Sequence, residues 1–365
     1  MRVLYLITHT TLVESECNIL RDLGLEVYIC KTDCGIRSCS VTYEFDDTLT
    51  LPKEVIEKLN KFDFYADTYP KELKKLINKH FDIAIIANVY PCALNIVKSF
   101  SGKVILRAFG YEDSINYEYT TSKLTREILG WRRLFKPKEL LFYNEMTRAL
   151  HKIKDRFILG YALESIIANE TPFFQKHSFY LPCGCGESIW AQENTWGGDI
   201  KKIMFVCPSI ETKEYGEIYR DFKNNFGDMP HSIFGKNIVP NEADENIIGF
   251  LERNLYDKAI KEYRVAFYHS QEPRHIHYSP IESIIFGQPL IFMRGGVLSM
   301  WAESRCAGEA KDIDEAREKI KRVLNGDSLF IDEVISSNKV MLEKTRYDYL
   351  RKHWECFIKQ YGGTK

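Results

Sequence analysis

The stretch MRVLYLITHTTLVESECNILRDLGLEVYIC, residues 1–30, contains the repeating unit that decides the fold. Residues 2–7 are nearly all apolar, which is typical of a parallel strand buried on both faces. Apolar residues recur at helical spacing over 13–23, Gly24 is suited to end a helix, and 25–30 again has the pattern of a strand. A strand, helix, strand unit of about 30 residues predicts a right-handed parallel crossover.

The same alternation continues along the chain and then starts again. A polar stretch at 187–199, which holds two tryptophans and two glycines, reads as a linker, and a new strand is predicted at 203–207. We therefore expect an α/β protein with two Rossmann-like, doubly wound parallel-sheet domains. The predicted bounds are 1–190 for the first domain, 198–335 for the second, and 336–365 for a C-terminal helix that packs back on the first.

Composition narrows the classes of protein that fit. The chain has 365 residues, of which 45% are apolar and 28% charged, so it is globular. Fifty Lys and Arg residues against 51 Asp and Glu give a net charge of -1, which predicts no nucleic-acid partner. No apolar run approaches the roughly 20 residues of a membrane span, and the N-terminus lacks a charged leader, so we expect a cytoplasmic protein. Its ten cysteines lack paired C-x-x-C spacing and predict free thiols without a bound metal.

The densest cluster of polar residues follows a strand in the second half, within YHSQEPRHIHYSPIESIIFGQPLIF, residues 268–292. Ser279 before Pro280 predicts a helix start whose open N–H groups bind a phosphate. Glu282 then falls in the first helical turn, where a carboxylate can accept both hydroxyls of a ribose. Compensation of the helix dipole is the alternative explanation for Glu282.

This region resembles the nucleotide-sugar signature of glycosyltransferases of the GT-B fold, in the form found in the group 1 or family 4-like C-terminal domains. The resemblance rests on Glu272 with Pro273, on Glu282, and on the turn Gly287 to Pro289. Nine residues separate the two glutamates, whereas the family usually has seven, and 8–11 replace a glycine pair of the first loop. The resemblance implies two GT-B domains, a nucleotide-sugar donor, and no cofactor or essential metal beyond that donor.

The implied activity is transfer of a sugar to a hydroxyl of a glycan, a lipid-linked or a small-molecule acceptor. A nucleotide-sugar epimerase, a phosphorylase of the same shape, and a non-catalytic binding protein are the alternatives. An inverting enzyme needs a general base and a retaining one does not, and the residues leave both mechanisms open.

The expected site residues fall into three groups. The expected catalytic residues are His9, Glu112, Asp113 and Glu272. The expected donor-binding residues are Ser209, Lys213, Arg274, Ser279, Glu282, Arg294 and Gly295. The expected acceptor-side residues are Thr10, Asn88, Tyr90 and Arg107.

One local segment departs from the neutral average. Basic and aromatic residues are mixed over 126–138, around Trp131, Arg132 and Arg133. Such a mixture suits the interface of a membrane, and it predicts peripheral membrane contact and a lipid-linked acceptor. An amphipathic helix with its aromatic residues in the core is the alternative.

Overall fold

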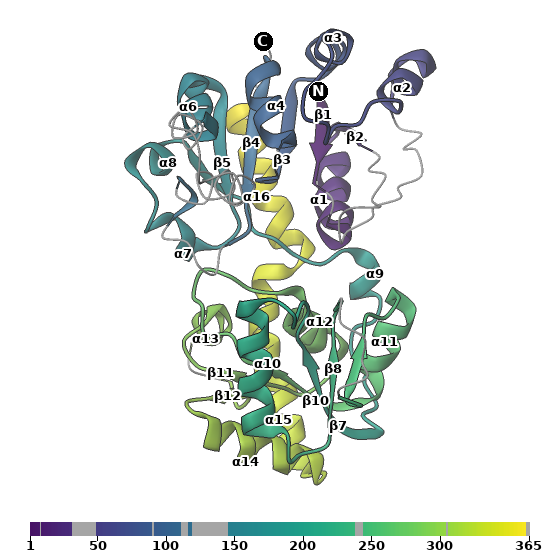
Figure 1. The fold of residues 1–365 in the computed structure, drawn as a ribbon, viewed down its shortest axis with the longest axis vertical. Coiled ribbons are helices and arrows are strands. Elements are labelled where there is room, and N and C mark those ends of the chain that lie inside the picture. The colour runs from purple at the N-terminus through teal and green to yellow at the C-terminus, as the bar shows by residue number, and fades with distance from the viewer. Residues whose placement is uncertain are drawn as a thin grey trace, which may run out of the picture. The chain divides into compact units, whose positions relative to one another are not determined.

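The computed structural model describes residues 1–7, 9–30, 49–89, 91–110, 116–118, 145–237, 244–303 and 306–362. The chain divides into two compact units, shown in Figure 1. The first unit consists of Met1–Gly186 together with Thr345–Lys365, and the second of Glu187–Lys344. Each unit contains one parallel sheet with flanking helices, which confirms the predicted α/β class with two Rossmann-like sheets.

The sheet of the first unit has six strands in the order β2-β1-β3-β4-β5-β6. Its four inner strands are largely buried and mostly apolar, as parallel strands covered on both faces require, whereas the edge strands β2 and β6 are less buried. They are β1 (Arg2–Leu6), β2 (Glu26–Ile29), β3 (Ile83–Ile86), β4 (Lys103–Ala108), β5 (Phe157–Tyr161) and β6 (Ser178–Tyr180). The helices are α1 (Thr10–Asp22), α2 (Lys53–Leu59), α3 (Lys71–His80), α4 (Cys92–Ser99), α6 (Glu145–Lys152), α7 (Glu164–Ile167), α8 (Pro172–Lys176) and α16 (Tyr347–Tyr361), with the short 3-10 helix η3 (Lys154–Arg156).

The sheet of the second unit also has six strands, in the order β12-β11-β10-β7-β8-β9. Stacked phenylalanines fill one side of it, with the rings of Phe205 and Phe222 centred 3.9 Å apart. The strands are β7 (Ile200–Val206), β8 (His231–Phe234), β9 (Ile247–Gly249), β10 (Tyr263–Tyr268), β11 (Leu290–Met293) and β12 (Glu309–Ala310). The helices are α9 (Glu187–Trp190), α10 (Lys213–Phe226), α11 (Arg253–Glu262), α12 (Tyr278–Phe286), α13 (Val297–Ala302), α14 (Ile313–Leu324) and α15 (Ser328–Asn338), followed by the 3-10 helix η5 (Lys339–Thr345).

The polar stretch read as a linker is built into the second unit. It begins with helix α9, and its backbone then pairs with the second unit. The N–H of Asn194 donates to the carbonyl of Ile285 at 3.0 Å, and that of Trp196 donates to the carbonyl of Phe286 at 2.9 Å. The polar segment 187–199 is therefore not a free linker, because part of its backbone is hydrogen-bonded to α12.

The C-terminal region differs from the single helix expected over 336–365. Helix α15 already begins at Ser328 and belongs to the second unit, whereas α16 belongs to the first unit. The 3-10 helix η5 lies between them. Trp354 of α16 is fully buried there, and the ring of Phe357 lies 5.4 Å from that of Phe179.

Candidate functional site

In each sheet the strand order reverses at one point, and ligands of open parallel sheets bind at the carboxyl ends of the strands beside such a point. In the second unit the reversal lies between β7 and β10. The loops that follow these two strands, 207–212 and 269–277, hold the predicted donor-binding residues Ser209 and Arg274. Three more, Lys213, Ser279 and Glu282, lie in the helices that follow these loops. In the first unit the reversal lies between β1 and β3, and the corresponding loops hold His9 and Asn88.

The loop after β7 carries Ser209 and leads to Lys213. Ser209 adopts a left-handed backbone conformation with φ 55, which turns the chain sharply after the strand. Thr212 caps helix α10 by accepting a hydrogen bond from the N–H of Tyr215 at 3.3 Å. Lys213 is the first residue of the 14-residue helix α10 and is exposed. The charge of its side chain and the positive end of the helix dipole are therefore on the same turn.

The loop after β10 places Glu272 against Arg274. One carboxylate oxygen of Glu272 accepts from the backbone N–H of Arg274 at 2.9 Å and from its Nε at 2.6 Å. The other accepts from Nη2 at 3.0 Å, so the ion pair is bidentate. This contact orients the Arg274 guanidinium. Both carboxylate oxygens of Glu272, an expected catalytic residue, are thus paired with Arg274.

Helix α10 and strand β10 both contact His277, which the sequence did not single out as a site residue. Its Nε2 lies 3.3 Å from the hydroxyl of Tyr215, and its Nδ1 lies 3.2 Å from the hydroxyl of Tyr268. Tyr215 belongs to α10 and Tyr268 ends β10, so one imidazole joins the elements on either side of the strand reversal.

The predicted capping role of Ser279 is wrong. Helix α12 begins at Tyr278, and His277 is its N-cap with extended φ and ψ values of -82 and 161. Ser279 and Pro280 are therefore the second and third residues of the helix. The proline still fits, because a first-turn N–H has no partner within the helix.

Glu282 lies in the second turn of α12 and is 4% exposed. Its Oε1 accepts from Nη1 of Arg253, the first residue of α11, at 2.7 Å. Burial raises the pKa of Glu282, and the Arg253 charge opposes that shift. Arg253 was missed by the sequence analysis, since nothing local marks it as the partner of a residue 29 positions away.

The loop after β11 holds Arg294 and Gly295 next to the loop after β10. The side-chain amide of Gln271 donates to the carbonyl of Arg294 at 2.7 Å. Gly295 has φ +107, a conformation that favours glycine, and its N–H donates to Ser299 Oγ at 2.9 Å. The Arg294 side chain is 57% exposed and lies 3.5 Å from Glu309.

In the first unit, His9 is the N-cap of α1, Thr10 is the first residue of that helix, and Asn88 follows β3. Burial lowers the pKa of His9, so its imidazole is neutral near pH 7. Tyr90, Glu112 and Asp113 lie outside the described residues, as does the basic aromatic segment 126–138.

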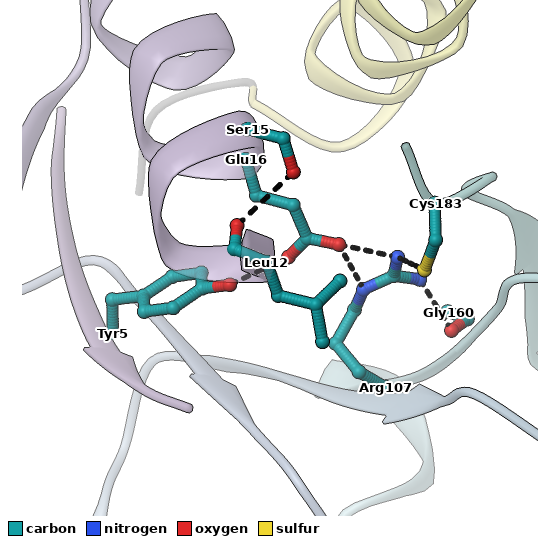
Figure 2. A network of polar contacts seen from close by, with 7 residues as sticks. All are labelled: Tyr5, Leu12, Ser15, Glu16, Arg107, Gly160 and Cys183. Atoms are coloured by element: carbon teal, nitrogen blue, oxygen red, sulfur yellow. Dashed lines mark hydrogen bonds and ion pairs between the residues drawn. The ribbon is translucent and has the colours of Figure 1, made fainter. Parts of the chain in front are cut away.

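Arg107 does not have the accessible position expected of an acceptor-binding residue. Figure 2 shows its guanidinium inside the first unit, facing the carboxylate of Glu16. Its Nε donates to Glu16 at 3.0 Å and its Nη1 to the carbonyl of Gly160 at 2.6 Å, while the Tyr5 hydroxyl donates to the second Glu16 oxygen at 2.9 Å. Arg107 is 1% exposed, so its charge is used within the core.

Two further features concern metals and membranes. Among the described residues, no group of three or more His, Cys, Asp or Glu side chains has an arrangement that could hold a metal ion. No helix in the described part of the chain is long and apolar enough to cross a bilayer.

The two units together have the GT-B architecture of two Rossmann-like parallel-sheet units, in agreement with solved glycosyltransferase structures. HepE from Anabaena, solved with UDP and glucose, is 9% identical over 99% of this chain and 100% of its own, with a TM-score of 0.57. The beta-glucosyltransferase of phage T4 with UDP and Mn2+ is 10% identical over 99% of both chains, with a TM-score of 0.54. The same T4 enzyme with its UDP-glucose substrate gives 11% identity, 99% coverage of both chains, and a TM-score of 0.52. No protein-family model matches the sequence, and no curated protein does.

Proposed function

We propose that this protein is a glycosyltransferase that moves a sugar from a nucleotide-sugar donor to an acceptor hydroxyl. The observation that carries the proposal is the contact between α10 and the loop after β10 at the strand reversal of the second unit, through Tyr215 and His277. The likeness to the T4 enzyme supports the same activity, since that enzyme takes UDP-glucose as substrate.

The donor diphosphate is the group that needs most stabilisation, because negative charge builds up on it as the sugar bond breaks. Arg274 supplies a planar cation, and its bidentate contact with Glu272 sets its direction before a ligand arrives. Lys213 and the N–H groups at the start of α10 supply further positive charge. Ser209 and Gly295 allow the chain to approach the phosphates. In this proposal Glu272 positions Arg274 and does not itself react.

The acceptor side belongs to the first unit. If the sugar is inverted, a base must take the proton of the acceptor hydroxyl, and His9 is suited to it because its lowered pKa keeps it neutral. Glu112 and Asp113 stay alternative bases, and Thr10, Asn88 and Tyr90 stay candidate acceptor contacts.

The acceptor class and the need for a metal are the finer parts of the proposal. We propose a glycan, lipid-linked or small-molecule acceptor, with peripheral membrane contact through 126–138 for a lipid-linked one. DNA is the less favoured acceptor, although a related structure is that of a DNA-modifying beta-glucosyltransferase, because the net charge here is -1. Arg274 and Lys213 neutralise the leaving group in this proposal without an essential metal.

The test is a thermal-shift screen of UDP-, GDP-, ADP- and dTDP-sugars, each with and without Mn2+. A donor at 100 times its Kd adds about 2.7 kcal/mol of stability, which is readily measured. The stabilising donor is then incubated without acceptor, and the released sugar and nucleotide diphosphate are identified by NMR. Slow hydrolysis supports the transferase. Epimerised donor, or binding without any turnover even with acceptors, contradicts it.

A further inference from the structure

The loop after β10, residues 269–277, is closed at its base by Tyr268 and His277. Tyr268 is the last residue of β10, and His277 is the last residue before α12. The hydroxyl of Tyr268 lies 3.2 Å from Nδ1 of His277 and accepts from the backbone N–H of His277 at 3.3 Å. Tyr268 is 7% exposed, so these hydrogen bonds are sheltered from water and are stronger than exposed ones. The two ends of the loop that carries Arg274 are therefore held together.

The same imidazole also contacts helix α10. Its Nε2 lies 3.3 Å from the hydroxyl of Tyr215, the third residue of that helix. A neutral imidazole has one donor and one acceptor nitrogen, and a hydroxyl serves in either role, so both contacts form at the same time. His277 therefore links the start of α10, which carries Lys213, to the loop that carries Arg274.

The effect of this link on a ligand depends on how many phosphates the ligand has. In the proposed function Lys213 and Arg274 both bind the donor diphosphate, and they belong to separate elements. A monophosphate needs only one of these elements. A diphosphate gains the full benefit of both only when their separation is fixed before it binds, because ordering them on binding costs free energy. A link that fixes the separation therefore favours the diphosphate selectively.

We propose, on the basis of the proposed function, that His277 is a positioning residue for the donor. It fixes the start of α10 against the loop after β10, and so it sets the preference for a nucleoside diphosphate over the monophosphate. In this proposal His277 acts through Tyr215 and Tyr268 and not on the ligand itself.

The experiment measures Kd by calorimetry for UDP, GDP and ADP, each against the corresponding monophosphate. The wild-type protein should prefer the diphosphate of the nucleotide it binds by roughly ten- to a hundredfold, the value of one added charge-assisted contact. In His277→Phe, which keeps a ring but has no nitrogen, this preference should fall below about threefold while the monophosphate binds nearly as before. Tyr215→Phe should give the same loss. The double variant should lose no more than either single one, because both substitutions break one link.

Tyr219→Phe is the matched control on the same helix. Tyr219 lies one turn after Tyr215 in α10, and its hydroxyl donates to Asp244 at 2.9 Å. This variant should leave the preference for diphosphate unchanged. The melting temperatures of Tyr215→Phe and Tyr219→Phe, recorded alongside, separate a general loss of stability from a loss of preference.

If His277→Phe does not fold, Tyr215→Phe decides. An unchanged preference in the folded variants, or an equal loss of affinity for monophosphate and diphosphate, overturns the inference. Wild-type protein that binds nucleotides without preferring the diphosphate also overturns it, but leaves the proposed glycosyl transfer standing, because the donor screen tests that separately. No binding of any of the six nucleotides overturns both.

Discussion

Arg107 and Glu16 lie 91 residues apart in the sequence and form an ion pair in the core of the first unit. The pair connects β4 to α1, and the Tyr5 hydroxyl and the Gly160 carbonyl complete its hydrogen bonds. Burial disfavours the charged guanidinium, but Glu16 still raises the pKa of Arg107 above its ordinary value. Burial, with Glu16 nearby, also raises the pKa of Tyr5. The network therefore holds two charges at the carboxyl edge of the first sheet without exposing either one.

Removing one partner of this pair should destabilise the protein strongly. Arg107→Met leaves the Glu16 charge buried and unpaired, and we expect a loss of about 3–5 kcal/mol in the free energy of unfolding. Urea unfolding followed by circular dichroism measures it. Arg351→Met, which breaks an exposed pair with Glu355 in the same unit, should cost less than about 1 kcal/mol. Equal effects of the two substitutions would show that Arg107 is not a structural charge.

The pair of Glu272 and Arg274 should affect ligand binding and leave folding almost unchanged. Both side chains are partly exposed, at 19% and 21%, so Glu272→Gln should change the melting temperature little. It weakens the bidentate hold on the guanidinium, and affinity for a nucleoside diphosphate should fall about tenfold. Calorimetry checks this, with the corresponding nucleoside as the control ligand. An equal loss for diphosphate and nucleoside would argue against Arg274 as the phosphate contact.

His9 should control the acid side of the pH profile if the enzyme inverts. A lowered pKa means that the imidazole stays neutral below the ordinary pH range of histidine, and that activity falls only when the pH drops through the lowered value. His9→Gln should reduce kcat by about 10²–10⁴ and remove this acid limb, with donor KM little changed. Rates measured over a pH series check both. A variant with wild-type kcat would assign the base elsewhere.

An exposed pair in the second unit gives a pH dependence of stability. Hydrogen bonds from Arg317, at 2.8 and 2.6 Å, lower the pKa of Asp228 from 3.8 to about 2. The folded carboxyl then binds its proton less readily than the unfolded one, so the stabilisation is complete above 3.8 and is lost as the pH falls toward about 2. The melting temperature of wild type should exceed that of Asp228→Asn at neutral pH. The gap should close in acid, and a gap independent of pH would contradict this coupling.

The local sequence was sufficient for the class of fold. Segments such as 3–7 and 83–87 are continuous apolar runs, because a parallel strand that is covered on both faces buries nearly all of its side chains. The loops after such strands could also be named in advance, since parallel strands all present their carboxyl ends at one edge. This is why His9, Ser209 and Arg274 were placed after strands from the sequence alone.

Tertiary structure decided which charges face each other. Arg107 lies near the carboxyl end of β4, where Glu16 from α1 pairs with it in the core, and Arg253 from α11 pairs with Glu282. The start of α12 one residue before Ser279 was likewise set by its surroundings, where Tyr215 and Tyr268 hold His277 at the cap. Hydrophobic periodicity is a local property of the chain, whereas the partner of a charge depends on contacts between residues far apart in sequence, and only the folded structure contains them.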